Sequence, residues 1–165
     1  MKIQKLSKAY KTRLIEINQL TVNHLSYPSQ YIPFTEKEIE AAFDDSGEVI
    51  LYGVMDHGTL AAVSGLFADV SDIAAELASL QICPEETAEI GGCMTLPEFR
   101  NKGYMLSLNR VLLRIARQKG YRYLVATAHP DNIASSRSLI QAGMKKVKEF
   151  YRHGDYRRDL YLLRL

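Results

Sequence analysis

Apolar and polar residues alternate along the chain in short segments whose spacing predicts a mixed arrangement of strands and helices. Apolar runs of strand length occupy 2–7, 48–55, 59–67, 87–96, 122–128, 144–151 and 156–165. Apolar residues recur at helical spacing in 10–20, 35–43, 103–119 and 132–141. Segment 70–82 is ambiguous, although its apolar residues favour a further helix. Without that segment, the predicted order is βααβββαβαββ.

Turn and cap residues mark the boundaries of these elements. Asp56-His57-Gly58 is turn chemistry for an antiparallel hairpin. The strand 87–96, the helix 103–119 and the strand 122–128 form a βαβ crossover, so these two strands should be parallel. The sequence therefore predicts an α+β fold with a central mixed sheet of about seven mostly antiparallel strands and about four helices. A chain of 165 residues suits a single domain, 1–165.

Composition narrows the class of protein. With 47% hydrophobic and 24% charged residues, the chain has the composition of a soluble globular protein. It has no apolar window of roughly 18 residues, and its first residues lack the pattern of a signal peptide, so we expect a cytoplasmic protein without a membrane partner. Two cysteines, with no Cys/His spacing typical of zinc sites, indicate neither a disulfide framework nor a metal.

The small net charge of +2 hides an uneven distribution along the chain. Residues 1–99 hold six Lys/Arg and fifteen Asp/Glu, or −9, whereas residues 100–165 hold fifteen and four, or +11. A segment this basic indicates an anionic partner, either a phosphate-bearing ligand or a nucleic acid. No aromatic residues typical of base stacking are interleaved with these charges, which argues against nucleic acid.

The segment from Arg100 to Met105, RNKGYM, lies between the strand 87–96 and the helix 103–119. Main-chain N–H groups at a helix amino terminus have no intrahelical acceptors, so a loop at this point can bind an anion such as a diphosphate. Gly103 permits close approach to the main chain, and Arg100 and Lys102 add positive charge. The segment is not a Walker loop, because GxxxxGK[ST] is absent.

The motif RNKGYM resembles the [RQ]xxGx[GA] signature of the GNAT superfamily of acyl-CoA-dependent N-acyltransferases. A second segment, Asn132 to Met144, is similar to the family's NxASxxxLxxxGF pattern. Two positions depart from the family: Met105 replaces the usual Gly or Ala, and Leu139 stands where many members have a tyrosine that protonates the leaving thiolate. The resemblance implies the GNAT fold, in which the parallel strands 87–96 and 122–128 splay apart around the cofactor.

The same resemblance implies acetyl-CoA as the acyl donor and assigns the residues that hold it. The pantetheine arm would bond to the main chain in the manner of an added strand, the diphosphate would lie on the loop, and two residues of the next helix would face the cofactor. These cofactor-binding residues are Met94, Thr95, Arg100, Asn101, Lys102, Gly103, Tyr104, Met105, Asn132 and Ser135.

Transfer of an acyl group to an amine requires an acceptor for the amine proton and a donor for the thiolate. Glu89 lies fourteen positions before Gly103, which resembles the spacing of the glutamate base in the histone-acetyltransferase branch, and we expect it to be buried among apolar neighbours. With Leu139 unable to act as the acid, Tyr104, Tyr151 and Tyr156 are candidates for that role by their reactivity alone. His129, at the end of the strand 122–128, could relay a proton. Cys93 has no histidine spaced to activate it, which favours a buried thiol over a nucleophile.

Two functions remain open at this point. The first is an N-acetyltransferase acting on the primary amine of a small molecule or of a protein or peptide. The second is a GNAT-like module that binds acyl-CoA as a sensor without turnover, which the departures at Met105 and Leu139 favour. The last hairpin, with Tyr156, Tyr161 and Leu163, offers an edge for a homodimer.

Overall fold

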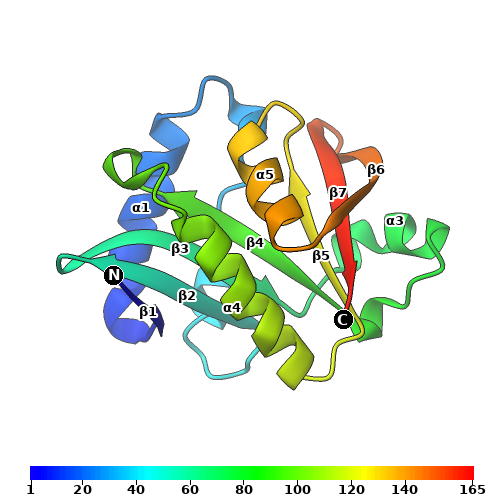
Figure 1. Ribbon diagram of the computed structural model, residues 1–165, viewed down its shortest axis with the longest axis horizontal. Helices are drawn as coiled ribbons and strands as arrows, with labels where there is room; N and C mark the ends of the chain where they lie inside the picture. The colour runs from blue at the N-terminus through cyan, green and yellow to red at the C-terminus, as the bar shows by residue number, and fades with distance from the viewer.

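One seven-stranded sheet organises the computed structural model, which describes all of residues 1–165 (Figure 1). Its strands are β1 (Lys2–Lys5), β2 (Val49–Asp56), β3 (Thr59–Phe67), β4 (Thr87–Thr95), β5 (Tyr123–Ala128), β6 (Lys145–Arg152) and β7 (Tyr156–Arg164). They lie in the order β1-β2-β3-β4-β5-β7-β6. The β4–β5 pair is parallel and every other pair is antiparallel, as the crossover predicts.

Five helices accompany the sheet, one more than the sequence predicts. They are α1 (Lys11–Asn23), α2 (Glu36–Ala41), α3 (Ala74–Ser79), α4 (Tyr104–Gln118) and α5 (Ile133–Gln141). The additional helix, α3, is a short one in the segment where the apolar spacing was ambiguous. It forms because Leu77 and the preceding Ile73 bury their side chains against β5 and β7. None of the helices combines the length and the apolar character that a membrane span needs.

Local signals explain several of these boundaries. Thr35 and Glu38 form a reciprocal capping box at the start of α2. The turn between β2 and β3 places His57 and Gly58 in the left-handed region, with φ of 47° and 82°, the backbone twist that tight hairpins favour. Gly103 caps α4 with φ of 75°. These elements are therefore encoded by short-range chemistry.

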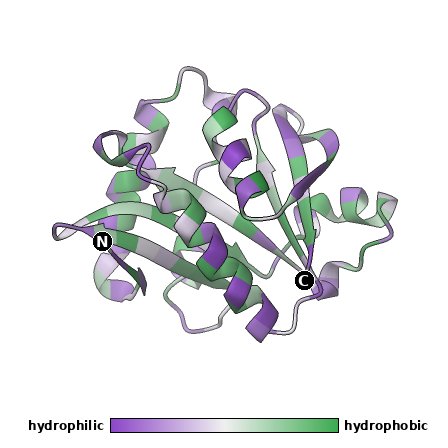
Figure 2. Cartoon of the chain, in the orientation of Figure 1, coloured by the Kyte–Doolittle hydropathy of each residue, from purple (hydrophilic) through white to green (hydrophobic).

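Helices cover both faces of the sheet. On one face, α4 and α5 pack on the strands, and Leu112 and Leu139 contribute to a cluster with Ile90 of β4. On the other face, Leu14 of α1 and Phe34 pack with inward-facing residues of β2, β3 and β4. The central strands are largely apolar, whereas polar residues colour the exposed side of α4 and much of the β6–β7 hairpin (Figure 2).

The β7 strand is an interior strand, because it lies between β5 and β6. Tyr161 is only 2% exposed and belongs to the core. The dimer edge that the sequence suggested at Tyr156, Tyr161 and Leu163 is therefore wrong in position, since the free edge of this hairpin belongs to β6. The sequence could not show this, because the order of strands in a sheet depends on long-range pairing.

Candidate active site

The parallel strands β4 and β5 separate after a short region of pairing. Their register runs from Thr87 with Tyr123 to Ile90 with Ala126, although β4 continues to Thr95. Along residues 91–95, the main chain pairs with β3 on one side and has no partner on the β5 side. An extended ligand could therefore bond to this edge as an added strand would.

A bulge at Gly92 accompanies this separation. The register between β3 and β4 shifts near Ser64, and Gly92 adopts φ of 59°, a conformation that costs little only for glycine. A Cβ built at Gly92 would lie 2.1 Å from the ring of Phe34. Both the backbone and the neighbouring ring thus require glycine here.

The loop after β4 presents main-chain donors at the start of α4. Asn101 and Gly103 are left-handed, with φ of 61° and 75°. The amides of residues 101–106 have no main-chain acceptor, and the first that has one is that of Ser107, which donates to the Gly103 carbonyl. A Cβ at Gly103 would meet no atom within 4 Å, so the main chain is open to a ligand. Arg100 is exposed. This geometry suits a bound diphosphate.

Asp56 holds this loop from the neighbouring hairpin. The hydroxyl of Tyr104 donates to the Asp56 Oδ2 atom over 2.6 Å, and Lys102 Nζ lies 3.4 Å from the same oxygen. The hydrogen bond from Tyr104 is the main cause that lowers the pKa of Asp56. The side chains of Tyr104 and Lys102 are therefore committed to Asp56, and the Tyr104 hydroxyl is not brought to the cavity that contains Glu89.

A cavity of about 340 Å³ passes through the sheet where β4 and β5 part, a volume typical of ligand pockets. Some of its lining residues, among them Asn109 and Leu139, come from α4 and α5 on one face. Others, including Tyr31 and Asp72, come from segments on the opposite face. The walls of the cavity therefore come from both sides of the sheet.

Glu89 lies in this cavity with 5% of its surface exposed. Its two carboxylate oxygens accept hydrogen bonds from the Arg152 guanidinium, over 2.6 and 2.9 Å. Arg152 also donates to Asp72 over 2.7 Å and to Thr127 over 3.0 Å. The surrounding of Glu89 is thus a buried ionic network and not the apolar one that its sequence neighbours suggested, because Arg152 arrives from β6, far along the chain.

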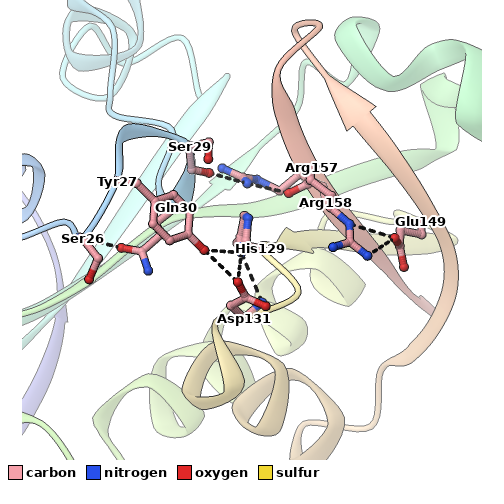
Figure 3. Close-up of polar contacts among 9 residues, drawn as sticks. All are labelled: Ser26, Tyr27, Ser29, Gln30, His129, Asp131, Glu149, Arg157 and Arg158. Carbon is pink, nitrogen blue, oxygen red and sulfur yellow. Dashed lines mark hydrogen bonds and ion pairs between the residues drawn. The ribbon is translucent and has the colours of Figure 1, made fainter.

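His129, at the end of β5, lines the same cavity. Its Nδ1 atom accepts the main-chain N–H of Asp131 over 3.1 Å, and the Tyr27 hydroxyl lies 3.3 Å from Nδ1 while donating to the Asp131 carboxylate (Figure 3). An N–H donor on Nδ1 assigns the ring proton of the neutral histidine to Nε2. That Nε2–H has no partner within the chain and is available as a donor.

The remaining predicted cofactor residues lie at the end of β4 and at the start of α5. Met94 is 1% exposed, so only its main chain can serve a ligand. The neighbouring Thr95, which is half-buried, also lies on the open edge of β4. Asn132 caps α5 by accepting the amide of Ser135 over 3.1 Å, and both residues also line the cavity. Leu139 is buried in the cavity wall, so no hydroxyl replaces the family's tyrosine there.

Cys93 also lines the cavity, and its sulfur lies 3.2 Å from the Ser64 hydroxyl. Burial raises the pKa of the Cys93 thiol to about 11. The sulfur therefore remains protonated near neutral pH and is a poor nucleophile.

Sequence reasoning missed three polar residues of the cavity. Arg152 and Arg158 belong to the basic carboxyl-terminal third, but no local motif distinguishes them from its other arginines. Asn109 lies on the buried side of α4, and its Oδ1 atom has no hydrogen-bond partner. An unpaired buried acceptor in a cavity wall is a natural contact for an amide of a ligand.

Comparisons with known proteins agree with this geometry. An N-acetyltransferase from Staphylococcus aureus is 21% identical, with a TM-score of 0.76 over 99% of this chain and 97% of that one. A ribosomal-protein-alanine N-acetyltransferase from Brucella melitensis is 13% identical, with a TM-score of 0.77 over 100% of both chains. A putative acetyltransferase from Salmonella typhimurium, solved with its cofactor acetyl-CoA, is 18% identical, with a TM-score of 0.76 over 99% and 93%.

At these identities, the structural likeness establishes the fold alone. No curated protein matches the chain by sequence. A family model described as the acetyltransferase (GNAT) family, however, matches residues 16–154, which is most of the chain. Together with the splayed strands and the open loop before α4, this match shows that the protein belongs to the GNAT acetyltransferase family.

Proposed function

We propose that this protein transfers an acetyl group from acetyl-CoA to the primary amine of an acceptor. The observation that carries the proposal is the cavity that crosses the sheet at the open edge of β4. A thioester and an amine could enter it from opposite faces and meet without moving the sheet. Family membership supports acetyl transfer as the reaction.

The residues present suit acetyl-CoA, which supplies an activated acetyl carbonyl when bound. Residues 100–105 would bind the diphosphate through main-chain amides and the Arg100 charge. Met94 and Thr95 would bond to the pantetheine arm through the main chain, and Asn132 and Ser135 would approach it from α5. The unpaired Asn109 oxygen is a further acceptor for a pantetheine amide.

Two side chains of the cavity would assist the transfer, one as a base for the amine and one as a hydrogen-bond donor to the leaving thiolate. Glu89 would accept the proton that the acceptor amine loses, directly or through a water molecule, using a lone pair that Arg152 leaves free. His129, with Nε2–H unpaired, would donate a hydrogen bond that stabilises the departing thiolate, which leaves as the anion and takes its proton from solvent. Because Cys93 stays protonated, we propose direct attack of the amine in a ternary complex rather than an acyl-enzyme route.

A second function, a non-catalytic acyl-CoA sensor, is favoured by one observation. Leu139 puts an aliphatic wall where many relatives of the family have the acid, and Tyr104 cannot take its place because Asp56 holds its hydroxyl. Such a module would bind acyl-CoA without releasing a thiol.

Calorimetric titration with desulfo-CoA tests the donor site. We expect micromolar binding by the wild type and a loss of at least about tenfold in affinity for Arg100→Glu, since hydrogen bonds to charged groups contribute about 1.5–3 kcal/mol. Arg110→Glu is the matched control, because Arg110 is exposed on α4 outside the loop. Absence of binding by the wild type would overturn both the enzyme and the sensor.

Thiol release from acetyl-CoA in the presence of an amine library then separates the two functions. For an enzyme, Glu89→Gln should lower kcat by about 10²–10⁴-fold, the usual contribution of a general base, and should leave the affinity for desulfo-CoA unchanged. If the wild type binds desulfo-CoA but releases no thiol with any amine, the sensor is the better description.

A further inference from the structure

Arg158 is a buried cation in the wall of the cavity. It lies on β7 and is 3% exposed. Its neighbour along the strand, Asp159, is unable to balance it, because Asp159 pairs with Lys146 over 2.7 Å and successive residues of a strand point to opposite faces. Arg158 therefore shares the face that carries Leu160, which packs with Ile73 and Val125 opposite α4 and α5.

The partners of Arg158 within the chain are all neutral. Its Nη1 atom donates to the main-chain carbonyls of Ser29, over 2.8 Å, and of Arg157, over 2.7 Å (Figure 3). The guanidinium also lies 5.3 Å from the centroid of the Tyr156 ring. The Nε and Nη2 atoms donate no hydrogen bond to the chain, and no carboxylate lies within ion-pair distance of Arg158.

Glu89, the carboxylate whose charge acts on Arg158, and Asp72 in the same cavity are already matched by another arginine. Glu89 and Asp72 both pair with Arg152. Burial and the charge of Arg152 lower the pKa of Arg158 to about 10, so it still carries its charge near neutral pH. A buried charge without a counter-ion is costly, and such groups concentrate at functional sites.

We propose that Arg158 binds a carboxylate of the acceptor, which is therefore an amine that carries a carboxylate in the same molecule, as a free amino acid does. A carboxylate is the planar anion that a guanidinium binds through paired hydrogen bonds, and it would supply the missing counter-ion. This inference rests on the proposed acetyl transfer and names the acceptor class of that same cavity.

Two other anions fit less well. The diphosphate of the donor would bind at residues 100–105, at the start of α4. Arg158 lies on the other face of the sheet, where it donates to the main chain of Ser29. The terminal amine of a protein chain is followed by a neutral peptide group, which cannot balance the guanidinium. The uncompensated charge thus favours a small amino acid over a protein terminus.

The test compares matched acceptors that differ only in the carboxylate. The probes are the free proteinogenic amino acids together with β-alanine and γ-aminobutyrate, their amides, and the corresponding decarboxylated amines, with thiol release as the readout. We expect the best carboxylate acceptor to exceed its amide by about 100-fold in kcat/KM, a value consistent with paired charge-assisted hydrogen bonds. Arg158→Gln should remove that preference, mainly by raising KM for the carboxylate-bearing acceptors.

Two further variants test whether the charge at position 158, and not any nearby arginine, sets the preference. Arg158→Lys retains a charge and should keep part of the preference, and Arg157→Gln is the control, because Arg157 is half exposed and pairs with Glu149 outside the cavity. Equal rates with carboxylates and amides, or a preference that survives Arg158→Gln, would overturn the inference.

The donor site is checked separately with desulfo-CoA. If the wild type binds desulfo-CoA but acetylates no carboxylate-bearing amine, only the inference about Arg158 is contradicted. A wild type that fails to bind desulfo-CoA contradicts the proposed transfer itself.

Discussion

The two ends of the cavity present different chemical groups, main-chain groups at one end and charged side chains at the other. At the donor end, the open edge of β4 and the loop before α4 offer main-chain groups within one continuous stretch, residues 91–106. At the acceptor end, charged side chains arrive from η3 (Ser71–Ile73), β4, β6 and β7. A main-chain site tolerates many sequences, which suits a donor common to a family. A site of side chains can change one residue at a time, which suits a variable acceptor.

The acceptor end repeats this contrast between two arginines. Arg152 is matched by Glu89 and Asp72, whereas Arg158 has only neutral carbonyls and an aromatic ring. A matched buried arginine stabilises the pocket that contains it. An unmatched one is better explained by a ligand.

The largest expected effect breaks the network around Arg152. Arg152→Met leaves Glu89 buried without its counter-ion, and we expect the free energy of unfolding to fall by about 3–5 kcal/mol in urea titration. Arg158→Met removes a charge that has no counter-ion, so its stability should equal or exceed that of the wild type. Similar losses for the two variants would contradict the distinction between a structural and a binding arginine.

A smaller effect is expected at Gly92, in the bulge of β4 that lines the cavity. Gly92→Ala combines a strained positive φ with a contact to Phe34, and we expect a loss of about 2 kcal/mol in the free energy of unfolding. Gly58→Ala is the matched control, because Gly58 also has a positive φ but no atom near its Cβ position, so about 1 kcal/mol is expected there. Equal losses would show that the Phe34 contact relaxes freely.

The smallest effect concerns the support of the donor loop and depends on pH. The hydrogen bond from Tyr104 lowers the pKa of Asp56 in the folded chain. Its stabilisation is therefore present above about pH 4 and is lost as the pH falls through the folded-state value.

Urea titrations of Asp56→Asn and the wild type between neutral and acidic pH measure this dependence. Asp56→Asn should have a lower free energy of unfolding than the wild type near pH 7, and this difference should disappear in acid. Asp155→Asn, in the exposed turn between β6 and β7, is the control and should show no such gap. A gap that stays constant across the pH range would show that the ionised carboxylate contributes nothing.

The sequence by itself determined those features that short-range chemistry encodes. Strand and helix spacing, the capping box at Thr35 and the Gly103 loop all depend on residues close together in the chain, and each is present in the structure. The parallel pairing of β4 and β5 also followed, because a crossover helix constrains strand direction.

The tertiary structure decided the partners of the charged residues. Glu89 was selected from the sequence, but its bond to Arg152 joins positions 63 residues apart, and Tyr104 proved to be held by Asp56 across 48. No sequence pattern pointed to Arg158, since its proposed role depends on the absence of a carboxylate around it in the folded chain. Local rules describe which elements form, whereas the charge balance of a buried site depends on side chains that only packing brings together.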